Sequence, residues 1–391
     1  MRVRAWLRFA VPLTALRGLG QAMEFVGWVL IARQIGPDQF GPLTVAFVVA
    51  RYAGLLADWG AERRGARDVA AGSGSARALV AQRGRLADGL AVAFAVGAVI
   101  AGTPWAAPLA AVTWHGGRNV DWVALGAVRS RRASAAALAR GGAMVAIGVA
   151  IAERDQITLA VGVAYLFATG VSHVAARPEL AKLPAATPGL VDAWALMITA
   201  LAAVYTVMDS VLVAALSGAG DAGVYGAVMR VPFGLATIAG LAVAALLPLV
   251  TRAVATEGRS PWDVARPAAT ASAAVAALLI VVSVPAAFLA VEVFGAEYVD
   301  GRWPLVILLW AQALAIGSAP LGAVLLSVGG DRGIAHIVAF AAGLNVVGNV
   351  ALIPLFGMIA AASTTVLAEA VVYVLFVRAL RSAPTREELL V

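Results

Sequence analysis

Residues 26–59 read VGWVLIARQIGPDQFGPLTVAFVVARYAGLLADW, two apolar stretches separated by the turn residues Gly36-Pro37-Asp38. Each stretch belongs to an apolar run of about 20 residues, the length that a helix needs to cross about 30 Å of hydrocarbon. Glycine, proline and aspartate together favour a tight turn over a continuous helix. The segment therefore predicts a hairpin of two membrane-spanning helices.

The same pattern continues along the whole chain. Of its 391 residues, 62% are hydrophobic and 13% are charged, whereas a soluble domain has about 45–50% apolar and about 25% charged residues. The absence of cysteine excludes disulfides and thiolate chemistry. We predict an all-α polytopic membrane protein with about twelve spanning helices. Their expected ranges are 10–33, 40–59, 86–102, 104–127, 135–152, 157–176, 190–216, 223–247, 267–294, 304–328, 333–354 and 358–378.

The distribution of arginine predicts the orientation of these helices. Alternate predicted loops hold 22 of the 29 basic residues, Arg83 and Arg140 among them, while the opposite loops hold only Arg33, Arg154 and Arg302. Because cytoplasmic loops collect arginine and lysine, both termini are predicted to be cytoplasmic. The net charge of +7 reflects this sorting, so we expect no nucleic-acid partner.

A short internal repeat predicts two lobes. The turn at 36–41 joins the first two helices, the turn at 220–226 joins the seventh and eighth, and both end in an aromatic-Gly pair. Six helices separate the turns, which indicates a parallel 6+6 repeat with the cargo site at the interface between the halves. The alternative is two unrelated turns. The expected lobes are 1–180 and 181–380, followed by a cytoplasmic tail at 381–391.

Several motifs along the chain form a recognisable pattern. Residues 32–41 read ARQIGPDQFG and residues 57–60 read ADWG; MDS at 208–210 is followed by GVYGA at 223–227, and LN at 344–345 by LIPLFG at 352–357. These segments resemble the motifs of bacterial polysaccharide-biosynthesis (O-antigen) flippases, which belong to the multidrug/oligosaccharidyl-lipid/polysaccharide exporter (MOP) superfamily. Ala360 departs from the pattern, since a glycine is usual there. The resemblance implies two six-helix lobes that alternate access.

Four arginines, Arg17, Arg51, Arg118 and Arg230, lie inside predicted spans. A charge in the hydrocarbon costs at least ~2.5–3.5 kcal/mol, so such residues usually face a protein interior or a watery cavity. Arg51 is about ten residues from either end of its helix, which makes snorkelling to the interface difficult. Arg118 lies in the polar stretch 114–121, which is either a break that lines the cavity or a loop. The basic set suggests an anionic cargo.

The lipid II flippase branch of the superfamily also carries arginines in its first, second and eighth helices. Arg17, Arg51 and Arg230 occupy the corresponding predicted helices here. That branch has an extra helix pair that lines a lipid groove, and this chain has no counterpart of it. The resemblance therefore implies an anion-binding role for the three arginines without placing the chain in that branch.

Other polar residues accompany these arginines. Gln21 follows Arg17 on one face of the first helix, which faces either a cavity or a seam between helices. Further candidates fall into three groups, each with an alternative. Asn345 and Asn349 are cargo ligands or interhelical hydrogen-bond partners; Glu24, Asp209 and Glu369 bind a coupling H⁺ or Na⁺ or neutralise an arginine, and Asp58 is a gate or an end-capping ion pair.

Neither a phosphate-binding loop nor a metal-ligand spacing of histidines occurs in the sequence. We therefore expect neither an enzyme nor a bound cofactor, apart from a coupling Na⁺ or H⁺. The leading hypothesis is a flippase of the bacterial cytoplasmic membrane. It would move an undecaprenyl-pyrophosphate-linked oligosaccharide to the outer leaflet for cell-surface polysaccharide synthesis, beside the glycosyltransferases and polymerase of that pathway.

Two alternatives to the flippase stay open. One is a cation-coupled multidrug antiporter of the same superfamily, whose cavity should contain carboxylates and aromatics rather than arginines. The other is a membrane-embedded glycan polymerase or ligase. Such an enzyme typically needs a large extracytoplasmic loop, and none is predicted here.

Overall fold

The computed structural model describes residues 3–71, 76–183, 193–236, 240, 260–327 and 330–382, and this part of the chain is helical with no strand. The all-α fold class is confirmed. Within the described ranges, six helical segments are long and apolar enough to cross a membrane, and two of them contain a hairpin. The chain divides into two compact units, Met1–Ala200 and Leu201–Val391. The predicted lobe boundary after residue 180 stays a prediction.

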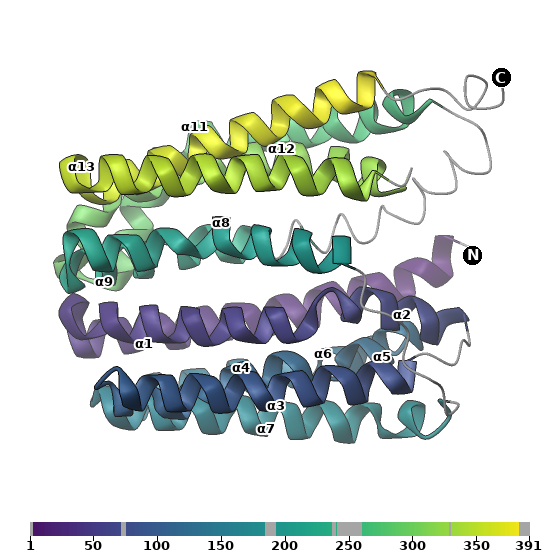
Figure 1. Ribbon diagram of the computed structural model, residues 1–391, viewed down its shortest axis with the longest axis horizontal. Helices are drawn as coiled ribbons and strands as arrows, with labels where there is room; N and C mark the ends of the chain where they lie inside the picture. The colour runs from purple at the N-terminus through teal and green to yellow at the C-terminus, as the bar shows by residue number, and fades with distance from the viewer. Residues whose placement is uncertain are drawn as a thin grey trace. The chain divides into compact units, whose positions relative to one another are not determined.

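Helix α1 (Val3–Asp58) forms the hairpin that the opening sequence predicts. Its helical geometry is interrupted at Gly36, where φ is 69° and ψ is 169°. A positive φ is unfavourable for residues with a Cβ, so glycine is the residue that this turn requires. Behind the turn, the buried rings of Trp28 and Phe40 meet edge to face with their centroids 6.1 Å apart. Figure 1 shows the two arms of α1, 3–35 and 37–58, joined at this turn.

The first unit surrounds this hairpin. Its further elements are α2 (Ala61–Ala71), α3 (Ala76–Ile100), η1 (Pro104–Leu109), α4 (Ala110–Arg118), α5 (Asp121–Gly126), α6 (Ser130–Ala150) and α7 (Arg154–Leu180). The first arm of α1 packs along α6 with backbone contacting backbone. A Cβ built on Gly27 would lie 2.4 Å from the carbonyl carbon of Met144, and one on Gly141 would lie 2.3 Å from the carbonyl oxygen of Gly20. Glycine allows helices to approach this closely inside a membrane.

The second unit ends in another hairpin. Its elements are α8 (Ala193–Ser217), which begins before the unit boundary, α9 (Ala219–Val228), α11 (Pro261–Phe294), η2 (Ala296–Gly301), α12 (Arg302–Ser327) and α13 (Asp331–Arg381). Helix α13 is interrupted at Gly357, where φ is 55°. This break separates the two predicted helices 333–354 and 358–378, whose arms are visible in Figure 1.

Two of the predicted helices differ from the structure. The expected continuous helix 104–127 is divided into η1, α4 and α5, with an extended backbone at Asn119 (ψ 132°). Helix α3 begins at Ala76, ten residues before the predicted start. Arg83, which the sequence placed in a cytoplasmic loop, therefore lies on a helix, and so does Arg140 on α6. The hydropathy pattern misses the start of α3 because charged side chains interrupt its apolar run, whereas Arg140 lies inside the predicted helix 135–152.

Parts of two other predictions lie outside the described residues. The predicted helix 223–247 is described up to residue 236 and at Gly240, and the predicted tail is described only at 381–382. Phe40 and Tyr225, the aromatic residues of the two repeated turns, are both fully buried. The parallel 6+6 relation between the halves stays a prediction.

The glycine seam between α1 and α6 generates a prediction about stability. Gly27→Ala should reduce the free energy of unfolding by about 1–3 kcal/mol, because the added methyl group overpacks the contact with Met144. Gly18→Ala is the matched control on the same helix, since nothing lies within 4 Å of its Cβ position. Thermal unfolding in detergent would measure both variants. Equal midpoints for the two would contradict close packing at Gly27.

Candidate functional site

A hydrogen-bonded network is buried in the first unit around the carboxylate of Glu24. Arg140 on α6 donates from Nε to Glu24 Oε2 at 2.9 Å, and the Tyr165 hydroxyl on α7 donates to Glu24 Oε1 at 3.0 Å. The guanidinium of Arg140 also lies over the Tyr165 ring, 5.3 Å from its centroid. Glu24 is 6% exposed, so an ion pair and a second donor compensate for its lost hydration. We call this set, together with His115 and Thr169, the Glu24 network.

His115 on α4 joins the Glu24 network through both ring nitrogens. Its Nδ1 lies 2.7 Å from Thr169 Oγ1, and its Nε2 lies 3.3 Å from Arg140 Nη1. A guanidinium can only donate, so Nε2 accepts and the proton is on Nδ1. The Thr169 hydroxyl donates in turn to the carbonyl of Tyr165 at 2.9 Å, which leaves its oxygen lone pairs for the histidine. His115 is therefore a neutral, fully hydrogen-bonded interior histidine.

A cavity of about 220 Å³ lies beside this network in the first unit. We call it the Arg51 cavity. Three residues of the Glu24 network, His115, Arg140 and Tyr165, line it together with residues of the second arm of α1. The lining residues are Arg51, Gly54, Leu55, Asp58, Glu62, Val112, His115, Gly116, Asn119, Arg140 and Tyr165. Two of the predicted site residues, Arg51 and Asp58, are thus brought together.

Arg51 differs from Arg140, the other cation of this cavity, in its contacts. Its side chain is exposed, and it makes no hydrogen bond or ion pair with any residue in the described ranges. Arg140, by contrast, is committed to Glu24. Arg51 is consequently the guanidinium whose donors are available to a ligand within this part of the chain, and the five donors of a guanidinium match a phosphate or carboxylate.

Part of the cavity wall is formed where α1 meets α4. A Cβ on Gly116 would lie 2.5 Å from the α-carbon of Gly54, so the two helices touch through their backbones. At the same level Asp58 forms an ion pair with Arg83, Nη2 to Oδ1 at 2.6 Å. The sequence predicted Asp58 as a gate or as an end-capping ion pair. Its described ion-pair partner is Arg83 of α3, and its Oδ1 also accepts from the backbone N–H of Glu62 at 3.2 Å.

The remaining predicted residues of the first unit lie outside the cavity lining. Arg17 donates to the carbonyl oxygen of Ala133 at 3.1 and 3.3 Å. Arg118 forms an ion pair with Asp88, and Trp114 Nε1 donates to that carboxylate at 2.9 Å. Gln21 is half-buried. The helix ends at Arg118, in agreement with the predicted alternative of a break in this stretch. However, the Arg51 cavity is lined by Asn119 and not by Arg118.

A second buried cluster lies in the second unit, around the carboxylate of Asp209 on α8. Asn349 Nδ2 donates to Oδ1 at 2.6 Å, the Thr365 hydroxyl donates to Oδ2 at 2.6 Å, and the Tyr225 hydroxyl donates to Oδ2 at 3.2 Å. Asn345 accepts from Asn349 at 3.1 Å. We call these five residues the Asp209 cluster; Thr364, which donates to Asn349, adjoins it.

The Asp209 cluster holds a carboxylate without a basic partner among the described residues. Asp209, Asn345 and Asn349 are all fully buried, and no arginine, lysine or histidine in the described ranges pairs with Asp209. Burying a lone carboxylate is costly. The cluster is therefore suited to hold a proton or a cation with oxygen ligands.

Two predicted residues of the second unit have fewer described contacts. Arg230 follows α9 and is half-buried, and Glu369 lies on the second arm of α13, one turn beyond Thr365, and is also half-buried. Arg51 and Arg230 belong to different units. Their predicted shared cavity stays a prediction.

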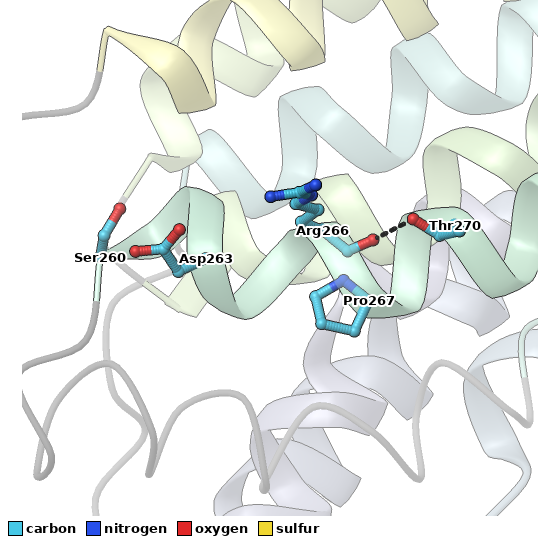
Figure 2. A pocket seen from close by; sticks show the side chains of 5 residues that line it. All are labelled: Ser260, Asp263, Arg266, Pro267 and Thr270. Carbon is cyan, nitrogen blue, oxygen red and sulfur yellow. Dashed lines mark hydrogen bonds between the residues drawn. The ribbon is translucent and has the colours of Figure 1, made fainter.

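A larger hollow of about 670 Å³ carries no comparable chemistry. Figure 2 shows its lining residues spread along the first turns of α11. The lining consists of Ser260, Asp263, Arg266, Pro267 and Thr270. The one hydrogen bond drawn between them runs within the helix, from the Thr270 hydroxyl to the Arg266 carbonyl at 2.9 Å. No second described element contributes a side chain, so this hollow is less suited to ligand binding than the Arg51 cavity.

The sequence reasoning missed the residues that complete the first site. Arg83 and Arg140 were counted as loop arginines, and Tyr165 and Thr169 were not considered. A signal was present, since Arg140 lies five residues inside its own predicted helix and Tyr165 and Thr169 are one turn apart in the middle of another. What the sequence lacks is the pairing of helices, which decides that these side chains meet Glu24.

Comparison with known proteins identifies the fold. No family model and no curated protein matches the chain. Among solved structures, an inward-facing multidrug resistance MATE family transporter of the MOP superfamily has 12% identity and a TM-score of 0.63, covering 95% of this chain and 98% of that chain. A mutant of the Vibrio cholerae MATE transporter VcmN has 15% identity and a TM-score of 0.62, covering 97% of each chain.

A third solved structure is a MOP superfamily transporter from Pyrococcus furiosus, described as having a binding pocket of reverse polarity that suggests a different function. It has 13% identity and a TM-score of 0.57, covering 97% of this chain and 96% of that chain. Likeness at these identities shows the fold alone. The chain has the multi-pass, membrane-embedded fold of MATE transporters.

The ion pair inside the Glu24 network generates a prediction about stability. Glu24→Gln should cost about 3–5 kcal/mol of unfolding free energy, because it leaves the guanidinium of Arg140 buried without a counter-charge. Glu24→Gln/Arg140→Gln should recover part of that loss. The matched control is Glu292→Gln, an exposed carboxylate paired with Arg302, whose effect should be about 0–1 kcal/mol. Chemical unfolding monitored by tryptophan fluorescence would measure all three, and a Glu24→Gln loss no larger than the control would contradict the buried pair.

Proposed function

We propose that this chain is a transporter of the MOP type, in which the Arg51 cavity binds an anionic group of the cargo. The observation that carries the proposal is the guanidinium of Arg51, unpaired within the described residues, in a polar cavity of about 220 Å³. A charge kept within an apolar helix hairpin costs at least ~2.5–3.5 kcal/mol. A residue retained at such a cost is best explained by a ligand that supplies the missing negative charge.

The cargo that suits this site best is a lipid-linked oligosaccharide joined through pyrophosphate. Arginine bonds phosphate oxygens through two parallel N–H groups and stays charged at any physiological pH. Asp58, Glu62 and Asn119 add acceptors to the same cavity, and acceptors suit the hydroxyl donors of a sugar. The lipid tail would remain in the bilayer while the head group crosses. We further propose the bacterial cytoplasmic membrane as the location, with glycosyltransferases and a polymerase as pathway partners.

A cation-coupled multidrug transporter is the second candidate. Its support is the fold itself, because two of the similar solved structures are described as MATE transporters and one of them as a multidrug resistance transporter. The polarity of the Arg51 cavity favours the first candidate. Glu24 is already neutralised by Arg140, so Arg51 would repel a cationic drug, and the similar structure described as having reverse polarity suggests that this fold accommodates cargo of more than one charge.

The Asp209 cluster supplies a location for the coupling ion that either candidate needs. We propose that Asp209 binds H⁺ or Na⁺, with the oxygens of Asn345, Asn349 and Thr365 as further ligands for a metal cation. The fit rests on the donor set: every side chain around the buried carboxylate carries oxygen, and hard cations prefer oxygen ligands. Occupation would neutralise the carboxylate and thereby change the energy of the unit that contains it.

Arg51→Ala tests the cargo site. In cells that depend on this chain, the variant should leave lipid-linked glycan on the inner leaflet and reduce transport at least about tenfold, the size expected for one lost charge-assisted contact of 1.5–3 kcal/mol. Arg33→Ala, an exposed residue of the same helix, is the control and should transport normally. Protein level and thermal midpoint should be unchanged in both.

Export of a cationic dye by the wild-type chain, together with glycan transport by Arg51→Ala, separates the two candidates. Export of a cationic dye such as ethidium should not depend on this chain if the cargo is anionic. If the wild-type chain exports the dye and Arg51→Ala leaves glycan transport intact, the multidrug candidate is correct and the lipid-linked cargo is wrong.

Asp209→Asn tests the coupling site. Asparagine keeps the size of the side chain but cannot release a proton or balance a cation, so transport should lose its dependence on the H⁺ or Na⁺ gradient. Proteoliposomes with imposed gradients of each ion would measure this, with Asp300→Asn, an exposed carboxylate of the same unit, as the control. Gradient-driven transport by Asp209→Asn at the wild-type rate would remove Asp209 from the mechanism.

A further inference from the structure

Arg83 is a buried cation that lies outside the lining of the Arg51 cavity yet touches three residues that form it. Its side chain is 1% exposed. It donates from Nη2 to Asp58 Oδ1 at 2.6 Å and to the Gly116 carbonyl at 3.0 Å, and from Nη1 to the Asn119 carbonyl at 3.0 Å. Asp58, Gly116 and Asn119 come from α1, α4 and the break after α4, and all three line the Arg51 cavity.

The two carbonyl contacts explain how the helix break is tolerated. The backbone leaves helical geometry at Asn119, so carbonyl groups at the end of α4 lose their intrahelical partners. Inside a membrane protein an unsatisfied carbonyl is costly, and a cation at a helix C-terminus also interacts favourably with the helix dipole. Arg83 supplies both the donors and the charge. The Trp122 ring, with its centroid 5.7 Å from the guanidinium carbon, covers it further.

The contact with Asp58 compensates one of the two carboxylates that line the cavity, the other being Glu62. Asp58 lies two helical turns from Arg51 on the same arm, a rise of about 10 Å, and both line the cavity. Without a counter-charge, the Asp58 carboxylate would compete with an incoming anion for the field of Arg51. Asp58 Oδ1 also accepts from the backbone N–H of Glu62 at 3.2 Å, but among its described contacts Arg83 is the one that brings a full positive charge.

We infer that Arg83 is a positioning residue for anion binding: it holds the broken end of α4 as the cavity wall and neutralises Asp58, so that Arg51 faces the ligand with its charge intact. The inference rests on the proposed anion-binding role of Arg51 and adds to it a second arginine that acts without touching the ligand.

The test measures binding of farnesyl pyrophosphate, a soluble isoprenoid pyrophosphate, to the purified full chain in nanodiscs at low salt. Arg83→Gln should weaken binding about tenfold, the effect expected for an uncompensated unit charge about 10 Å from Arg51 at an effective dielectric constant of about 20. Arg85→Gln is the matched control, since Arg85 is exposed on the same helix, and its affinity should equal that of the wild type.

Asp58→Asn separates the proposed role from a merely structural one. The variant leaves the charge of Arg83 uncompensated near the cavity, so it should bind farnesyl pyrophosphate more tightly than the wild type although its thermal midpoint falls. Arg83→Gln/Asp58→Asn should return the affinity toward the wild-type value. A structural role alone would weaken binding in both single variants, and that result would overturn the inference.

Two further variants keep the test decisive. If Arg83→Gln fails to fold, Arg83→Lys retains the charge beside Asp58 and should bind within about threefold of the wild type, whereas a tenfold loss would overturn the charge argument. Arg51→Ala distinguishes failure of the proposed function from failure of the inferred role of Arg83. Unchanged binding by that variant contradicts the proposed function, while lost binding together with weakened Asp58→Asn contradicts only the role of Arg83.

Discussion

Burying charge in an apolar environment is the constraint on which the interior of this protein depends. A carboxylate or guanidinium taken out of water must gain a counter-charge, a set of hydrogen bonds or a ligand, since its desolvation costs several kcal/mol. Glu24 meets the requirement with Arg140 and Tyr165, and Asp58 meets it with Arg83. In the first unit these pairs connect α1 to α6, across 116 positions of sequence, and α1 to α3. Among the arginines that line the Arg51 cavity, Arg51 is the one without an ion pair in the described part of the chain, and its guanidinium is what suits the cavity to an anion.

The two units meet the same constraint with different chemistry. The first unit pairs the carboxylates of Glu24 and Asp58 with guanidinium groups, which neutralises both and makes them structural supports. The second unit surrounds Asp209 with an amide and two hydroxyls, which satisfy the oxygens but not the charge. A site of the first kind offers an anion its remaining arginine, whereas a site of the second kind offers a cation or a proton its carboxylate. The proposed cargo recognition and ion coupling therefore fall in separate units.

Fold similarity identifies the architecture, whereas the local chemistry of the Arg51 cavity bears on the cargo. The solved MATE structures share the architecture at 12–15% identity, which is too low to transfer a cargo. The guanidinium of Arg51 in the cavity is the feature of this chain that favours an anionic cargo over a cationic drug. The tight contacts around the cavity, such as Gly54 against Gly116, leave little freedom for its wall to move independently of the helices that form it.

The sequence by itself determined the all-α membrane class and the hairpin turns at Gly36 and Gly357, because apolar run length and glycine conformational freedom are local properties of the chain. It also singled out Arg51, because a charge in the middle of an apolar helix is visible without any partner. Only the tertiary structure decided that Arg83 and Arg140 are interior residues, that α4 is broken, and that Asp209 meets Asn349 across 140 positions of sequence. The physical reason is that a hydropathy pattern counts every charge as unfavourable in an apolar helix. Whether a buried charge is compensated depends on side chains from other helices, which only the packing of the helices brings into contact.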